Sequence, residues 1–181
     1  MDYTACHKND VFVDLNDREY DEAVAHGKHM YAHSQKSGLR DYINKTKGER
    51  AQILGSVCER AVAKALGIYW TAWIDTFHKS DLPFNIEVRL IGVDNYGMQV
   101  YDKDDDSRRV VGIIMEKGKE RKPYRIPGWI NAKYAKQKKW RMDPNWKGHP
   151  FYGVPQQKLH HIDHLKRLIG QEMIQSSSLK K

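Results

Sequence analysis

The sequence predicts an α/β domain with a mixed central sheet, and three patterns support this prediction. Apolar residues recur at helical spacing between residues 46 and 67. Residues 86–93 and 97–102 follow a period of two, which is typical of a strand with one buried face. The run VVGIIM, residues 110–115, is continuously apolar and bounded by charge, as expected for a strand buried on both faces.

Two helices are predicted before the strands. The first covers about residues 17–36, and Asn16 or Asp17 can cap its N-terminus. The second covers residues 46–67 and ends at Gly67, because glycine readily adopts the left-handed conformation that closes many helices.

The remaining chain adds strands and a last helix. Between Ile68 and Ile126 short turns separate the strand patterns, so a meander of three or four strands is expected. Further short strands are predicted in PYRIPGWI and FYGV, with a basic helical turn between them. The C-terminal helix begins near Pro155, a residue well suited to a helix start. Its apolar stripe consists of Leu159, Ile162, Leu165, Leu168 and Ile169.

The length and composition indicate one compact domain with a hydrophobic core. The chain has 181 residues, of which 40% are hydrophobic. We expect a polar N-terminal helical arm over residues 1–45, a main domain over residues 46–170 and a frayed tail over residues 171–181.

The charge of the chain favours an anionic partner. The formal net charge is +8, so nucleic acid is the first candidate and an acidic membrane surface the second. No apolar run approaches the length of a membrane span, and the first ten residues are too polar for a signal peptide. Cys6 and Cys58 match no zinc or redox spacing, and we interpret them as reduced thiols of a cytoplasmic protein.

Three carboxylates and an arginine form the candidate site. Glu59 lies at the flank of the apolar stripe of its helix, with small or apolar neighbours one turn away. Glu87 and Arg89 project from the same face of a predicted strand, and Asp81 precedes that strand across a turn. Converging carboxylates suit Mg²⁺, and the arginine suits a phosphate. Taken alone, the same residues also fit a surface glutamate and an ion pair at a sheet edge.

The order of four segments favours the metal site over a surface glutamate and an ion pair. GERAQILGSVCERAVAKALGIYW, DLPFNIEVR, RIPGWI and YGVPQQKL together resemble the restriction-endonuclease-like superfamily, the PD-(D/E)XK nucleases, and more narrowly a phage-encoded group within it. The resemblance covers about residues 46–165. It implies an αβββαβ core with a mixed central sheet, here with an N-terminal helical arm and a C-terminal helix.

The resemblance also implies a role for each matching residue. Asp81 and Glu87 would bind Mg²⁺ or Mn²⁺, together with the carbonyl of Val88, and Glu59 would orient water. Arg89 stands where the family motif usually has lysine. Because arginine stays protonated, it stabilises charge but cannot act as the general base.

A basic segment follows the strands. Residues 117–147 contain eleven lysines and arginines against two acidic residues, with aromatic residues between them. This composition suits contact with a nucleic-acid backbone, although it also fits a solvated basic face around core tryptophans. The candidate nucleic-acid-binding residues are Lys133, Lys136, Lys138, Lys139 and Arg141.

Three other clusters of acidic residues or histidines are not interpreted as metal-binding or catalytic sites. Asp102, Asp104 and Asp106 mimic the start of a calcium loop but lack its later residues, so a turn is predicted. His160 and His164 are one helical turn apart without an evident third zinc ligand, which favours a surface or DNA-facing cluster. The histidines of the first helix, His26, His29 and His33, are interpreted as a pH-sensitive surface.

The sequence therefore predicts a metal-dependent deoxyribonuclease whose partner is DNA. The alternative is a catalytically silent nuclease fold that binds DNA or protein, and a weaker one is a phage assembly protein. A homodimer is compatible with the resemblance, and a small-molecule substrate is not expected. The geometric test is whether Glu59, Asp81 and Glu87 face one another.

Overall fold

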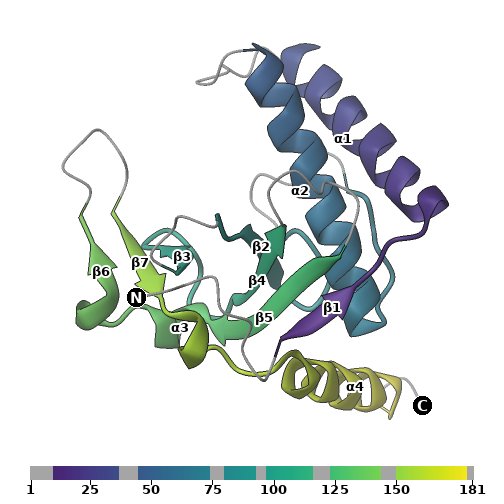
Figure 1. Ribbon diagram of the computed structural model, residues 1–181. Coiled ribbons are helices and arrows are strands. Elements are labelled where there is room, and N and C mark those ends of the chain that lie inside the picture. The colour runs from purple at the N-terminus through teal and green to yellow at the C-terminus, as the bar shows by residue number, and fades with distance from the viewer. Residues whose placement is uncertain are drawn as a thin grey trace.

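The computed structural model describes residues 10–36, 45–73, 80–92, 97–115, 123–143 and 150–178. In this part of the chain the helices are α1 (Asp17–Lys36), α2 (Lys45–Leu66), α3 (Ala132–Ala135) and α4 (Ile162–Ser178). A four-stranded sheet has the order β1 (Val11–Val13), β5 (Tyr124–Asn131), β4 (Arg109–Met115) and β2 (Ile86–Leu90). A three-stranded sheet has the order β3 (Met98–Tyr101), β7 (Phe151–Val154) and β6 (Arg141–Met142). The mixed α/β architecture expected from the sequence is therefore present (Figure 1).

The strand directions make the larger sheet mixed. β2 is parallel to β4, whereas β4 and β5, and β5 and β1, are antiparallel. The predicted meander is wrong, because β3 leaves this sheet and pairs with β7. Parallel neighbours need a crossover between them, and β3 lies within that crossover.

Local sequence signals account for the two long helices. The side chain of Asn16 accepts a hydrogen bond of 2.8 Å from the amide of Glu19, and Glu19 accepts one of 2.9 Å in return. This capping box begins α1 at Asp17, as predicted. Gly67 follows α2 with a φ of 69°, which is the expected glycine termination. α1 and α2 run antiparallel beside each other in Figure 1.

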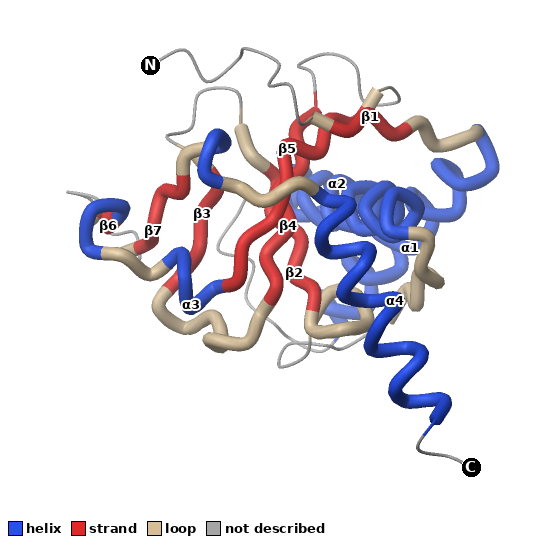
Figure 2. Tube along the Cα trace, turned by 90° about the horizontal axis from the view of Figure 1, so that it is seen from below, coloured by secondary structure: helices blue, strands red, loops and turns tan. Residues whose placement is uncertain are grey.

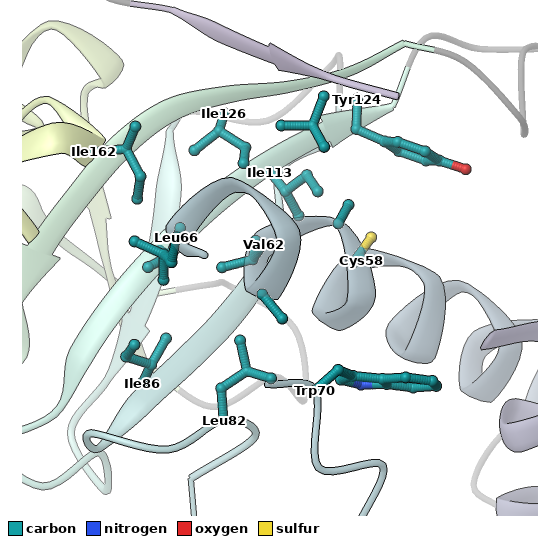
Figure 3. Packing of buried hydrophobic residues seen from close by; sticks show 14 of the residues in the cluster. Cys58, Val62, Leu66, Trp70, Leu82, Ile86, Ile113, Tyr124, Ile126 and Ile162 are labelled. Carbon is teal, nitrogen blue, oxygen red and sulfur yellow. The ribbon is translucent and has the colours of Figure 1, made fainter. Parts of the chain in front are cut away.

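The main core lies between α2 and the four-stranded sheet. Figure 3 shows Val62 and Leu66 of α2 among Ile113 and Ile126 of the central strands, and these side chains are buried. Cys58 is also buried there. The buried side chains of α4, Ile162, Leu165 and Ile169, pack into the same core.

The three-stranded sheet covers the other face of β4 and β5. Val110 and Ile130 of the larger sheet pack in one cluster with Val100 and Val154 of the smaller sheet. Figure 2 shows the two long helices and the smaller sheet on opposite sides of the larger one. β4 is thus buried on both faces, as its apolar run predicts.

Both ends of the described chain differ from the sequence prediction of a helical N-terminal arm and a last helix that begins near Pro155. At the N-terminal end, β1 joins the larger sheet, and Asp10 beside it pairs with Arg125 at 2.7 Å. Near the C-terminus, Pro155 precedes a short 3-10 turn, Gln156–Lys158, and α4 starts only at Ile162. Among the described helices, none has the length and apolar character needed to cross a membrane.

Candidate active site

A cleft of about 750 Å³ lies beside the edge strand β2. Glu59 of α2 lines one wall, and Asp81, Glu87 and Arg89 line the other. All four residues singled out from the sequence therefore face the same cavity. The other residues that line the cleft include His26, Ser56, Trp73, Tyr101, Asp104 and Arg108.

A tight reversal of the chain brings Asp81 to the strand. Leu82 forms a bridge with Ile86, and Phe84 and Asn85 adopt positive φ values of 62° and 56° in the turn between them. As a result, the carboxylate of Asp81 lies beside β2 and accepts a hydrogen bond of 2.8 Å from the amide of Val88. The turn predicted after Asp81 thus returns its side chain to the site.

Glu87 lies between two guanidinium groups. Its Oε1 accepts a hydrogen bond of 2.5 Å from Nη1 of Arg89, and its Oε2 accepts one of 2.6 Å from Nη1 of Arg108. Only 8% of Glu87 is exposed, so both ion pairs are shielded from water. Arg108 was not identified from the sequence. It precedes β4, and the parallel pairing of β2 with β4 brings it to the cleft.

Arg89 is fixed by a second carboxylate. Its Nη2 donates a hydrogen bond of 3.0 Å to Asp104, which also accepts one of 2.9 Å from the amide of Tyr101. The guanidinium lies 5.5 Å from the centre of the Tyr101 ring. Asp104 belongs to the turn predicted from the sequence, but its contact with Arg89 was missed, because no local pattern relates two residues on separate elements.

Burial and mutual repulsion perturb two of the carboxyl groups. Burial raises the pKa of Glu59 to about 8, and the charges of Asp81 and Glu87 add to the rise, while the Trp70 side chain opposes it. Burial likewise raises the pKa of Asp81 to about 6, and the charge of Glu87 adds to this rise. The Val88 amide and the guanidiniums of Arg89 and Arg108 oppose it. These carboxyls are therefore electrostatically coupled.

The donor chemistry of the cleft fits a hard divalent cation at two carboxylates. Glu59 and Asp81 carry the oxygen ligands that Mg²⁺ prefers, and a cation would relieve their repulsion. Glu87, a predicted ligand, has each oxygen engaged by an arginine. Within the described ranges no three His, Cys, Asp or Glu side chains form a ready metal-binding group. Magnesium commonly uses only one or two carboxylates and retains water.

A histidine of α1 and a serine of α2 also line the cleft. Nδ1 of His26 lies 3.0 Å from Oγ of Ser56, and its ring packs edge-on against Trp70 at 5.2 Å. Burial is the main reason that the pKa of His26 is lowered. His33 also lines the cleft, whereas His29 is exposed. The histidines predicted to form one surface therefore have different environments.

The candidate nucleic-acid-binding residues lie on α3 and the segment that leads into the smaller sheet. Lys133, Lys138 and Lys139 are exposed. Lys136 instead holds the neighbouring turn, with hydrogen bonds of 2.6 Å to the carbonyl of Asp104 and 2.8 Å to Asp106. Arg141 is exposed and forms an ion pair of 3.2 Å with Asp143.

The second histidine cluster lies around a buried tryptophan. The rings of His160 and His164 each lie 5.6 Å from Trp129, and both histidines are exposed. Only 5% of Trp129 is exposed, so this residue belongs to the core. In the part of the chain that the structure describes, no third ligand converges with this pair.

The cleft thus combines carboxylates that can hold a cation with guanidiniums that can bind an oxyanion. Both groups come from elements that are separated in sequence, so the fold assembles the site. A comparison of the chain with protein-family models, with curated proteins and with solved structures found no match.

Proposed function

We propose that this protein is a phosphodiesterase that cleaves DNA with the help of Mg²⁺ or Mn²⁺. One observation carries the proposal: Glu59, Asp81, Glu87 and Arg89, which come from a helix, a turn and a strand, line a single cleft. The raised pKa values of Glu59 and Asp81 support it, because perturbed carboxyls in a cleft are typical of functional sites.

The residues of the cleft have distinct roles in this proposal. Asp81 and Glu59 would hold the cation, which when bound supplies Lewis acidity and lowers the pKa of water. With the cation bound, Glu59 would be ionised, and in this form it would accept hydrogen bonds from the water that the cation retains. Arg89, held by Asp104, stabilises negative charge on the phosphate but cannot accept the proton.

DNA is the proposed substrate because the chain has a strong positive charge. The net charge of +8 favours a polyanion, and the exposed Lys133, Lys138 and Lys139 add basic surface on α3 and the turn after it. The same charge would serve a binding protein without catalysis. The double ion pair of Glu87 favours this second candidate, because it engages both oxygens of an expected cation ligand.

Cleavage assays distinguish the two candidates. Linear, nicked and branched DNA are incubated with the protein in Mg²⁺, Mn²⁺ or EDTA. We expect cation-dependent cleavage by the wild type and by Asp163→Asn, an exposed substitution on α4, and a loss of at least about a hundredfold for Asp81→Asn. DNA binding without cleavage of any substrate in either cation would support the silent binding protein instead.

A further inference from the structure

The carboxylate of Glu87 occupies a site that has the chemistry of a phosphate-binding site. Its two oxygens are contacted by two different guanidiniums, at 2.5 Å from Arg89 and 2.6 Å from Arg108. We propose that Arg89 and Arg108 form a clamp for a backbone phosphate of the nucleic acid, and that Glu87 occupies this clamp until the phosphate displaces it. The inference rests on the proposed function and adds Arg108 to it.

The geometry of the contacts suits an exchange of anions. Arginine recognises carboxylates and phosphates with the same planar set of N–H donors. A phosphodiester presents two non-bridging oxygens on one phosphorus, as Glu87 presents two oxygens on one carbon. Each guanidinium now contacts one oxygen of Glu87, so a phosphate can take over both contacts.

Arg89 and the backbone of Arg108 are anchored independently of Glu87. Arg89 also donates to Asp104 and lies over Tyr101. The backbone of Arg108 is fixed by a hydrogen bond of 2.9 Å to the carbonyl of Asp105, and its own carbonyl accepts one of 2.8 Å from Ala132. Arg89 therefore stays in place when Glu87 leaves the clamp, and so does the backbone that carries Arg108.

The displaced carboxylate would alter the charge of the cleft. Glu87 already raises the pKa values of Asp81 and Glu59 through its charge, although two arginines now compensate it. When a phosphate binds these arginines, they no longer neutralise the charge of Glu87. The affinity of the cleft carboxylates for a cation should then rise. Binding of DNA and of a divalent cation should therefore be positively coupled, each strengthening the other by the same factor.

Binding measurements test the clamp without relying on catalysis. A fluorescent DNA duplex with hydrolysis-resistant phosphorothioate linkages is titrated with protein in EDTA and in Mn²⁺, and Mn²⁺ affinity is measured with and without the duplex. In the wild type we expect the duplex to strengthen Mn²⁺ binding by roughly fivefold or more. Arg108→Gln should weaken binding of the duplex, strengthen binding of Mn²⁺ alone, since Glu87 is released, and reduce the coupling.

The neighbouring arginine provides a matched control. Arg109 lies next to Arg108 in the chain, but its guanidinium pairs with Glu172 of α4. Arg109→Gln should therefore retain the wild-type coupling. If Arg108→Gln fails to fold, Glu87→Gln decides the question. This variant removes the competing charge, so it should bind the duplex in EDTA at least about threefold more tightly than the wild type.

The outcomes separate the clamp from the proposed reaction. Equal coupling in the wild type and Arg108→Gln would overturn the clamp, as would Mn²⁺ affinity that does not respond to the duplex. In the absence of a folded Arg108→Gln, unchanged or weaker duplex binding by Glu87→Gln would overturn it. Coupling without cleavage of natural DNA would support the clamp and contradict the nuclease proposal. Cleavage of natural DNA without coupling would support the nuclease proposal and contradict the clamp.

Discussion

The carboxylate of Asp81 accepts a hydrogen bond of 2.8 Å from the amide of Val88, on the far side of a tight turn. This bond fixes Asp81 beside Glu87 and so brings two negative charges together at the start of the edge strand. The consequence is visible in the pKa of Asp81, which burial and the charge of Glu87 raise to about 6. Repulsion among the carboxyls therefore opposes folding unless protons or a cation compensate it.

The first prediction concerns the dependence of stability on pH in EDTA. The pKa of Glu59 is raised from 4.5 to about 8 in the folded protein, so the folded state retains a proton that the unfolded state has lost. The contribution of Glu59 to the free energy of unfolding should fall as pH rises through this interval and level off above it. Glu59→Gln should remove this contribution and be more stable than the wild type at pH 9, by roughly 3–5 kcal/mol.

Urea denaturation between pH 5 and 9 measures the effect. The difference between wild type and Glu59→Gln cancels the contributions of the titrating groups that do not interact with Glu59. Glu22→Gln, which removes an exposed carboxylate of α1, serves as the control and should follow the wild-type curve. A constant difference between wild type and Glu59→Gln across this range would contradict the raised pKa.

The second prediction concerns divalent cations. Because a cation binds the ionised carboxylates, Mg²⁺ should raise the Tm of the wild type more at pH 8 than at pH 5.5. At a hundredfold excess over Kd the stabilisation is about 2.7 kcal/mol, or roughly 5–10 °C for a chain of this size. Differential scanning calorimetry with EDTA reversal measures it. A similar rise in Asp81→Asn, or with NaCl of matched ionic strength, would show that the effect does not come from this site.

Much of the fold follows from local sequence signals. The capping box of Asn16 and Glu19 starts α1 where the sequence predicts it, and the apolar run of β4 is buried on both faces. Glu59 could be chosen because its helical neighbours are small or apolar, and small neighbours suggested the close approach of another element. A Cβ built at Gly55 meets open space, so no element packs closely there.

The parts that could not be predicted depend on contacts between distant segments. Nothing in residues 86–115 indicates that β3 joins another sheet or that β2 and β4 lie parallel. That pairing brings Arg108 within 2.6 Å of Glu87, although 21 positions separate them in the sequence. Likewise, Asp104 resembles any turn aspartate until the fold places Arg89 beside it. The candidate carboxylates could be chosen from the sequence, whereas Arg108, which contacts Glu87, and Asp104, which contacts Arg89, could not.

The third prediction assigns Asp104 a positioning role. In Asp104→Asn the side-chain NH₂ group would face a donor, either Nη2 of Arg89 or the amide of Tyr101, because both now donate to this buried carboxylate. We expect a loss of about 1–3 kcal/mol in the free energy of unfolding and weaker duplex binding in EDTA. Asp106→Asn alters an exposed carboxylate of the same turn and should change stability by no more than about 0.5 kcal/mol. Wild-type duplex affinity in a folded Asp104→Asn would exclude a role in orienting Arg89.

The fourth prediction concerns the close crossing of α1 and α2. A Cβ at Gly27 would lie 2.5 Å from Cα of Ile53 and 2.8 Å from the carbonyl oxygen of Gln52, and backbone atoms cannot yield as side chains do. Gly27→Ala should therefore lower the free energy of unfolding by about 1–3 kcal/mol, although alanine favours helix. Because His26 is adjacent, separation of the helices should also disrupt its contact with Ser56.

A second glycine provides a control for this prediction. Gly55 lies in the middle of α2, and a Cβ added there contacts nothing within 4 Å. Gly55→Ala should therefore stabilise the protein by about 1 kcal/mol through helix propensity alone. Urea denaturation of the two variants should give changes of opposite sign. If both alanines stabilised the protein equally, the helices would not approach as closely as the backbone at Gly27 requires, and the wall that carries His26 would have to be formed in another way.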